Sequence, residues 1–213
     1  MLNALLELCP CKHLKDKPIA ENFFNKLPEI YKELIEDAKL ILNNDPAARS
    51  LEEIILTYPG FFAIATYRIC HYLHQLNIPV LPRLISEYSH SKTGIDIHPA
   101  AKIQSPFFID HGTGIVIGET CEIGKNVKIY QGVTLGALIV NKDMTDKKRH
   151  PTIEDNVVIY SNATILGGQT IIGHDSIIGG NVWLTKSLEP NSIVYYKSNI
   201  TIKNNESELL FHI

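Results

Sequence analysis

The sequence has no excess of basic residues and no long apolar run. Its 213 residues carry 20 Lys and Arg against 23 Asp and Glu, a formal net charge of −3. Proteins that bind nucleic acid or anionic membranes through charge generally carry a basic excess, so we expect neither partner. No apolar segment approaches the roughly 20 residues of a membrane span. The leucine-rich start lacks the basic residues and the cleavage site of a signal peptide.

Cysteine is scarce, and its four copies are scattered along the chain. Four residues are too few for a disulfide framework in a chain of this length. Cys9 and Cys11 lie close together, but one such pair lacks the four spaced ligands of a structural zinc site. We therefore expect a reducing, cytoplasmic compartment and no bound metal. Hydrophobic residues make up 45% of the chain, enough for a core in one large domain or two small ones.

The first ninety or so residues show the spacing of amphipathic helices. From Pro28, a favourable first-turn residue, apolar side chains recur every three or four positions, as in a helix with one buried face. Asp45 is expected to cap the helix that follows. A central helix over 61–76 and another over 81–88 come next. Residues 1–92 are therefore predicted to form an N-terminal helical domain.

After this segment the apolar period changes to six. Fourteen repeat positions in four runs are all Ile or Leu: Ile97, Ile103, Ile109, Ile115, Ile117, Ile123, Ile129, Leu135, Ile153, Ile159, Ile165, Ile172, Ile178 and Leu184. A period of six fits neither a helix nor a simple alternating strand. It is typical of a parallel β-helix, in which each hexapeptide supplies one strand and one turn. Such coils are left-handed, a property taken from the repeat class.

The predicted fold is therefore of the α+β class. The helical domain precedes a left-handed parallel β-helix over residues 93–189, and residues 190–213 form a C-terminal tail. One interval between repeats is eighteen residues long, and its polar run must form a loop extruded from the coil. Long loops on rigid scaffolds commonly carry function.

Departures from the repeat mark the candidate functional residues. The extruded loop ends in Arg149 and His150, and the coil that carries Asp110 and His111 is two residues too long. Asp96 lies at a turn about one coil edge earlier. An acid beside a histidine indicates a base whose ring is oriented by a carboxylate.

These residues stand in motifs that resemble the serine acetyltransferases, a family of hexapeptide-repeat acyltransferases. The helical half matches at Asn44-Asp-Pro-Ala47 and Tyr67-Arg-Ile-Cys-His71, and the repeat half matches at 96–103, 110–120, 132–136 and 149–151. The resemblance covers residues 28–189. It implies transfer of the acetyl group of acetyl-CoA to the hydroxyl of L-serine. The products would be O-acetylserine and CoA, in the first step of cysteine biosynthesis.

The resemblance also implies roles for ten residues and several partners. His111 would be the general base and Asp96 its partner. L-serine would be held by Asp45, Asp110, Arg149 and His150, and acetyl-CoA would run along turns near Gly136, Ala137, Ser161 and Gly180. The assembly would be a homotrimer or a dimer of trimers with active sites between neighbours. L-cysteine would be a feedback inhibitor, and the C-terminal Ile213 would dock into O-acetylserine sulfhydrylase.

The chemistry of the residues agrees with these roles. A serine hydroxyl is a poor nucleophile and needs a base within hydrogen-bond reach. His111 would accept the hydroxyl proton as the oxygen attacks the thioester, and would return it to the CoA thiolate. Asp45 and Asp110 suit an ammonium group. Arg149 and His150 suit a carboxylate, because a guanidinium fork matches that group.

Three alternatives remain open at this point. A hexapeptide acetyltransferase for a sugar or xenobiotic hydroxyl would use the same base, with little need for the acidic pair and the arginine. A γ-type carbonic anhydrase-like protein would bind zinc through three histidines, for which His111, His150 and His174 are candidates. A non-enzymatic scaffold would only regulate the sulfhydrylase through its tail. An acceptor panel, a metal analysis and detection of CoA release separate the three.

Overall fold

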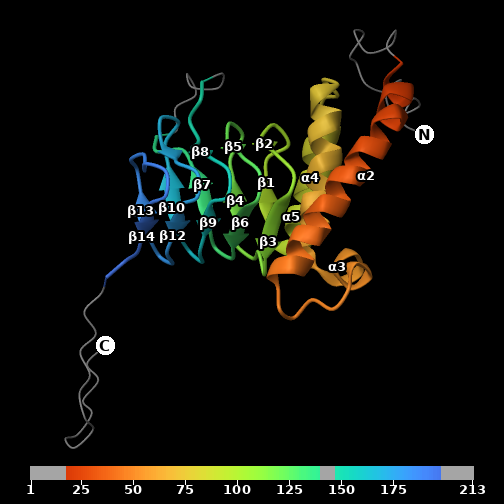
Figure 1. Cartoon of the computed structure of the whole chain (residues 1–213). Helices are drawn as coiled ribbons and strands as arrows, with labels where there is room; N and C mark the ends of the chain where they lie inside the picture. The colour runs from red at the N-terminus through yellow and green to blue at the C-terminus, as the bar shows by residue number, and fades with distance from the viewer. Residues whose placement is uncertain (1–17, 140–146, 198–213) are drawn as a thin grey trace, which may run out of the picture.

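The computed structural model describes residues 18–139 and 147–197 of the chain. Cys9, Cys11, Ile213 and the centre of the predicted extruded loop lie outside these residues. The described part consists of helices followed by a parallel β-helix (Figure 1). Within it, no helix is both long and apolar enough to cross a membrane.

The N-terminal part of the described chain is helical, as predicted. Its helices are α2 (Ile19–Asn44), α3 (Leu51–Thr57), α4 (Pro59–Gln75) and α5 (Leu81–Thr93). The predicted start at Pro28 is wrong, because α2 begins at Ile19 and contains this proline. Asp45 is the C-cap of α2 and does not cap the next helix. That role belongs to Ser50, whose side chain accepts a hydrogen bond from the Glu53 N–H.

The rest of the described chain winds through three parallel sheets, and each coil adds short strands to them (Figure 1). The first sheet contains β1 (Asp96–Ile97), β4 (Val116–Ile117), β7 (Thr134–Gly136), β10 (Thr164–Leu166) and β13 (Trp183–Leu184). The second contains β2 (Lys102–Ile103), β5 (Glu122–Ile123), β8 (Thr152–Ile153) and β11 (Ile171–Ile172). The third contains β3 (Phe107–Asp110), β6 (Val127–Tyr130), β9 (Val158–Ile159), β12 (Ile177–Ile178) and β14 (Ile193–Val194).

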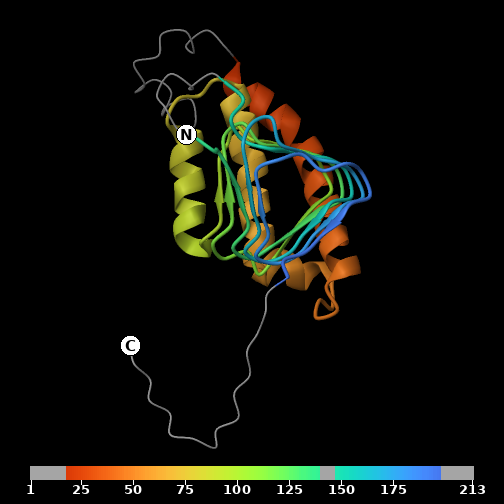
Figure 2. The ribbon, with the colours of Figure 1, turned by 90° about the vertical axis from the view of Figure 1, so that its left-hand side faces the viewer.

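Three rows of turns connect the sheets. We call the turns from the first to the second sheet the first corner, those from the second to the third sheet the second corner, and those from the third back to the first the third corner. Seen along the axis in Figure 2, the coils lie over one another and the helices stand behind them. A residue at one corner is therefore stacked above its equivalents in the neighbouring coils.

Burial of the repeat residues confirms the hexapeptide prediction. Thirteen of the fourteen Ile and Leu side chains are buried, and Leu184 in the last coil is half-buried against them. Equivalent residues stack in register, as Ile97, Ile117 and Leu135 do in the first sheet. Burying one such side chain contributes about 2 kcal/mol. This stacked column is therefore the main stabilising element of the β-helix.

A buried ion pair joins the helices to the first coil. Arg68 on α4 donates from Nε and Nη2 to the two carboxylate oxygens of Asp37 on α2, at 2.5 and 2.8 Å. Asp37 also accepts the Phe107 N–H of β3 at 2.8 Å. The Tyr67 hydroxyl donates to the Ala101 carbonyl at 2.5 Å and belongs to the same buried cluster as the β-helix. The helices thus fix the position of the coil that carries the candidate base.

Candidate active site

The third corner is enlarged where His111 lies. Asp110 pairs with Tyr130 of the next coil, and Val116 pairs with Thr134. The chain advances six positions from Asp110 to Val116 but only four from Tyr130 to Thr134. The first coil therefore has two extra residues at this corner, as the sequence predicts. The extra turn leaves the His111 side chain 72% exposed.

Glycine is required directly after His111. A Cβ at Gly112 would lie 2.4 Å from Cδ1 of Ile95, and the backbone of Gly112 has a φ of +87°. Because this position packs directly on a buried isoleucine, the extra turn extends toward solvent at His111. The candidate base is thereby presented on the outside of a rigid coil.

The backbone of His111 is itself left-handed, with a φ of 57°. The other non-glycine residues with positive φ in the β-helix are all Asn or Asp: Asn126, Asn156, Asn162, Asp175, Asn181 and Asn191. Asn and Asp tolerate this conformation, whereas histidine at such a position is strained by about 1 kcal/mol. Strain of this kind is typical of residues held in place for function.

Two carboxylates, one of them beside His111, act on the same tyrosines near this corner. Its Nδ1 lies 3.8 Å from Oδ1 of Asp110. The Asp45 carboxylate, just after α2, accepts hydrogen bonds from the Tyr58 hydroxyl at 2.7 Å and the Ala47 N–H at 2.8 Å. The hydrogen bond to Asp45 raises the pKa of Tyr58 to about 12, helped by burial and by the negative charges of Asp45 and Asp110. Both carboxylates therefore act at one place, which suits a bound ammonium group.

Asp96 lies on β1, paired with Val116. Its carboxylate, the Glu87 carboxylate and the His90 ring each offer an atom within 4.8 Å of the others. This is the one group of acidic and histidine side chains in the described residues whose spacing suits a metal ion. Within those residues no hydrogen bond or ion pair joins Asp96 to His111, so their partnership stays a prediction.

Arg149 and His150 occupy the first corner, at the base of the extruded loop. The Thr120 hydroxyl oxygen accepts both of their backbone N–H groups, at 2.9 and 3.0 Å. The Arg149 guanidinium forms an ion pair with Glu119. The His150 ring lies directly on Gly118, where a Cβ would be 2.0 Å from Cδ2 of the ring. This glycine is required by the close approach of the ring.

The His150 ring is neutral near pH 7. Burial, followed by the charge of Arg149, lowers the pKa of His150 to about 4. The Thr120 N–H donates to Nδ1 at 3.1 Å, and the Thr120 hydroxyl lies 2.9 Å from the same nitrogen. Since Nδ1 accepts a hydrogen bond, the proton of the neutral ring is assigned to Nε2. Arg149 thus offers a charge at this corner, and His150 offers a neutral N–H donor.

Residues that the sequence did not single out hold this corner together. The Lys148 ammonium donates to the Thr120 carbonyl at 2.8 Å and to the His150 carbonyl at 2.7 Å, which closes the base of the loop. Burial would raise the pKa of Glu119, but the hydrogen bond and charge of Arg149 hold it below its ordinary value. Tyr58 has a matching role at the third corner. Glu119 and Thr120 lie within the matching segment 110–120, but the sequence assigned them no role, because each acts through a tertiary hydrogen bond.

The predicted serine-binding residues form two half-sites in one chain. We call Asp45 and Asp110, together with the predicted base His111, the acidic half-site, and Arg149 with His150 the basic half-site. They lie at different corners, separated by one side of the coil, which at the rise of an extended strand is on the order of 15 Å. A molecule of the size of serine cannot touch both half-sites of the same chain. A groove of about 740 Å³ over the second sheet contains no residue of either one.

The predicted acetyl-CoA residues border the first sheet on both sides. Gly136 ends β7, and Ala137 follows it at the first corner. Ser161 and Gly180 lie at the third corner in successive coils, where a Cβ at Gly180 would be 3.2 Å from the Ser161 carbonyl oxygen. The structure thus brings Ser161 and Gly180 together and places Gly136 and Ala137 across the sheet from them.

The three histidines of the zinc alternative lie at three different corners. His111 is at the third corner, His150 at the first, and His174 at the second, where its Nδ1 lies 2.6 Å from Oδ2 of Asp175. One chain therefore does not gather them around a single ion.

Comparison with known proteins identifies the family. A scan of protein-family models gives no match. A serine acetyltransferase of Bacillus licheniformis is 45% identical over 174 residues, which cover 82% of this chain and 79% of that protein. The chain belongs to the serine acetyltransferase family. A plasmid-encoded serine acetyltransferase of Synechococcus elongatus is 52% identical over 181 residues, and the match covers 83% of this chain but 56% of that relative.

Solved structures of serine acetyltransferases share the fold. Isoform 3 from Entamoeba histolytica, in complex with cysteine, has a TM-score of 0.85 at 37% identity and covers 96% of this chain and 71% of its own. The Neisseria gonorrhoeae serine acetyltransferase in complex with serine has a TM-score of 0.76 at 34% identity, and the match covers 84% of this chain and 71% of that one. A serine acetyltransferase in complex with CoA has a TM-score of 0.72 at 36% identity, and the match covers 83% of this chain and 72% of that one. The likeness to this family confirms the left-handed β-helix.

Proposed function

We propose that this serine acetyltransferase family member transfers the acetyl group of acetyl-CoA to the hydroxyl of L-serine. The observation that carries the proposal is the pair of complementary half-sites. A free amino acid has one ammonium and one carboxylate, which match the acidic and the basic half-site. Structures of relatives hold serine or CoA, which supports the same pair of substrates.

The reaction is a direct transfer through His111. The imidazole accepts the proton of the serine hydroxyl while the oxygen attacks the thioester carbonyl. The tetrahedral intermediate collapses with cleavage of the C–S bond, and the imidazolium returns its proton to the CoA sulfur. Asp96 orients the ring and stabilises the imidazolium. The products are O-acetylserine and CoA, and the enzyme is unchanged.

The complete site forms between two copies of the chain. Since the half-sites of one copy are too far apart for one serine, the acidic half-site of one copy must meet the basic half-site of its neighbour. Repetition of this head-to-tail contact around an axis closes a ring. We propose a homotrimer, or a dimer of trimers, as its assembly.

L-cysteine is a proposed inhibitor at the same site. It carries the same ammonium and carboxylate as L-serine, and a relative has been solved in complex with cysteine. Ile213 lies outside the described residues, and its docking into O-acetylserine sulfhydrylase stays a prediction.

A CoA-release assay with an acceptor panel tests the proposed function. We expect release that depends on L-serine, with a kcat about 100-fold lower or more in His111→Ala, because the general base is lost. His174→Ala is the matched control, since that imidazole is half-exposed at another corner, and it should keep wild-type activity. CoA release with a sugar but not with L-serine would contradict the proposal that L-serine is the acceptor. Absence of CoA release with every acceptor, together with an activity that depends on added zinc, would favour the γ-type carbonic anhydrase-like alternative.

A further inference from the structure

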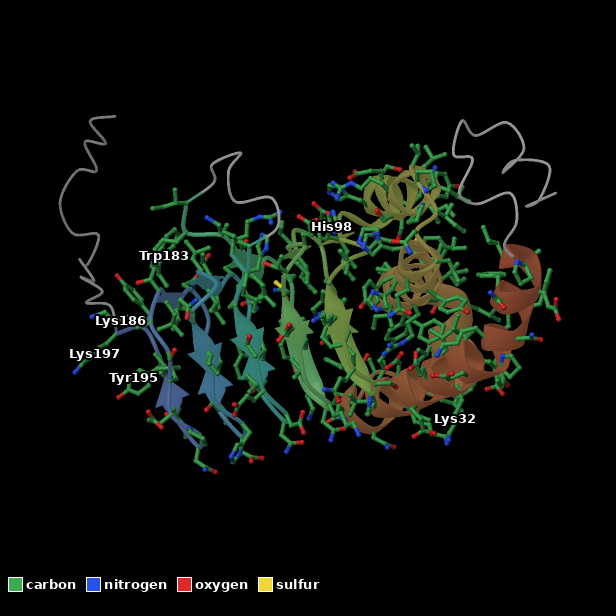
Figure 3. The ribbon with its side chains drawn as sticks, turned by 90° about the horizontal axis from the view of Figure 1, so that it is seen from above. Lys32, His98, Trp183, Lys186, Tyr195 and Lys197 are labelled. Atoms are coloured by element: carbon green, nitrogen blue, oxygen red, sulfur yellow. The ribbon has the colours of Figure 1, made fainter. Side chains whose placement is uncertain are left out.

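A cavity of about 350 Å³ lies between the helices and the first corner of the first coil. Its wall is built from the end of α4, the connection to α5, the first turn of α5 and the turn after β1. This volume is at the small end of the range for ligand pockets, so a small molecule or ion would fill it. Figure 3 shows His98, which belongs to the wall, at the junction between the helices and the β-helix. We call this cavity the junction pocket.

The charged and titratable side chains of the wall are all basic. They are His74, Arg83 and His98, and none of the described residues that line the pocket carries a carboxylate. Two larger cavities differ in this respect. The groove over the second sheet is lined by four carboxylates, and the cavity between α2 and α4 is lined by three. A concave site with basic groups and no acidic ones favours an anion.

His98 has a ring N–H that is available to a ligand. Its Nδ1 accepts the Ala100 N–H at 3.1 Å, so the proton of the neutral ring is assigned to Nε2. Burial is the main cause that lowers the pKa of His98, which keeps the ring neutral near pH 7. No described residue accepts a hydrogen bond from Nε2. This N–H is therefore free to donate to an anion.

Arg83 and His74 lie close enough to His98 for their charges to act on its ring. Besides burial, the charge of Glu119 raises the pKa of the ring, and the charges of Arg83 and His74 lower it. The Arg83 guanidinium pairs through Nη2 with Oε1 of Glu87 at 2.5 Å, which leaves most of its five N–H groups available. Within the described residues the His74 ring has no hydrogen bond or ion pair. An anion bound between the three basic groups would reduce their mutual repulsion.

The wall of the junction pocket is rigid. The Leu81 N–H donates to the Pro79 carbonyl at 2.6 Å, across a γ-turn in which Val80 has a φ of 64° and a ψ of −50°. A β-branched residue is strained in this conformation, which fixes where α5 begins. Pro79, Pro82 and Pro99 line the same wall, and each has a fixed φ. A preformed pocket favours binding, because little further ordering is needed.

The donors reach the pocket from three separate elements, which are α4, α5 and the turn after β1. A phosphate group has three or more strong acceptor oxygens in a tetrahedral arrangement and carries close to two negative charges at pH 7. A carboxylate has two oxygens in one plane and cannot meet all three donors. The arrangement therefore suits a phosphate better than a carboxylate.

We propose that the junction pocket binds a phosphate dianion, either free or as the monoester of a small molecule. The Arg83 guanidinium supplies the positive charge, and His74 and His98 donate N–H groups to the phosphate oxygens. The site is separate from the basic half-site but near it, since Glu119 pairs with Arg149 and its charge also acts on His98. This second anion site goes beyond the proposed function.

Calorimetric titration of the full chain with inorganic phosphate, without substrates, tests the site. Arg83→Gln should weaken phosphate binding about tenfold, the scale of one lost hydrogen bond to a charged group. Lys92→Gln is the matched control, because it removes the same charge from an exposed position of α5 that does not line the pocket. Its affinity should equal that of wild type. Absence of binding to wild type, or equal affinities in the two variants, would overturn the proposal.

A variant that gains affinity keeps the test independent of any loss of folding. Glu87→Gln releases the Arg83 guanidinium from its ion pair and should strengthen phosphate binding several-fold. Glu36→Gln removes the same charge from the exposed pair with Lys39 on α2 and should leave the affinity unchanged. No gain in Glu87→Gln, or the same gain in both variants, would contradict the role of Arg83.

Further ligands and one further variant separate the junction pocket from the other anion sites. Phosphate binding should persist in Arg149→Ala and in the presence of CoA. Its loss in that variant would assign the phosphate to the basic half-site, and displacement by CoA would assign it to the donor site. Malonate should bind at least tenfold more weakly, and equal affinity would overturn the choice of phosphate.

Glycerol phosphate identifies the source of the phosphate group. Tighter binding than that of inorganic phosphate, lost in Arg83→Gln, would show that the pocket holds a monoester, and weaker binding would show that it holds the free ion. None of these measurements requires turnover, so their outcome is independent of the proposed transfer to serine.

Discussion

At the scale of single residues, the two half-sites differ in how their charges are held. Asp45 is fixed by two donors, the Tyr58 hydroxyl and the Ala47 N–H, so its carboxylate points in a defined direction. His150 is fixed by Thr120 and remains an uncharged donor next to Arg149. On the proposed function, the ammonium of L-serine would meet carboxylates, and its carboxylate would meet the Arg149 guanidinium and the neutral N–H of His150.

Removal of the Tyr58 hydroxyl should weaken serine binding. In Tyr58→Phe the Asp45 carboxylate loses one of its donors, and we expect the KM for serine to rise roughly tenfold, the scale of one hydrogen bond to a charged group. The kcat and the KM for acetyl-CoA should remain near wild type. Steady-state kinetics measure all three, with Tyr31→Phe on the exposed face of α2 as the control. An equal loss with every acceptor would show a structural role instead.

The neutral state of His150 predicts a pH dependence of stability. Its folded pKa is about 4, against about 6.5 in an unfolded chain. Between these values the unfolded chain binds more protons, so the free energy of unfolding should fall as pH falls from 6.5 to 4, with no further effect below.

Denaturant titrations of wild type and His150→Asn between pH 4 and 7 measure this contribution. The free energy of unfolding should change less steeply with pH in the variant, and the difference in slope should correspond to at most one bound proton. Identical slopes would mean that the ring is not buried as a neutral group.

At the scale of elements, the period of six was enough to predict the β-helix, because each coil repeats the same burial. The start of α2 was not predictable from local signals. Ile19 is helical because it packs on Leu73 and Ile78, a tertiary contact that outweighs the proline inside the helix. In the site, Asp110, His111, Arg149 and His150 could be singled out because they are departures from the repeat. Thr120 and Tyr58 could not, because their roles depend on tertiary hydrogen bonds.

The contact between α2 and α4 depends on the Asp37–Arg68 pair. Asp37 is fully buried, so Arg68→Met leaves an uncompensated charge and should cost about 3–5 kcal/mol of stability. Asp37→Asn combined with Arg68→Met keeps an acceptor for the Phe107 N–H and should recover part of this loss. Urea unfolding measures both variants.

The exposed Lys39–Glu36 pair is the control for the buried one. Lys39→Ala should cost less than about 1 kcal/mol, because the pair is half-exposed and at 2.9 Å on the surface of α2. Equal costs for Arg68→Met and Lys39→Ala would contradict the role given to the buried pair.

At the scale of the whole molecule, the half-sites of one chain lie at two different corners of the coil, with the first sheet between them. The β-helix is rigid, so no motion within a chain brings Asp110 to Arg149. On the proposed function, activity would therefore be a property of the assembly: each copy would give a base and carboxylates to one site, and a guanidinium and an imidazole to another. The resemblance to the family implied sites between neighbouring copies, and the order of the corners supplies the physical reason, because it separates the two sets of residues within one chain.

Mixing two inactive variants tests this central claim most directly. His111→Ala and Arg149→Ala are assayed for serine-dependent CoA release alone and after exchange of their subunits at equal concentrations, with mass spectrometry to verify mixed assemblies. If each site takes its base from one copy and its guanidinium from the neighbour, random assembly restores about a quarter of the wild-type activity. Mixed assemblies no more active than the separate variants would contradict the account, because the site would then lie within one chain.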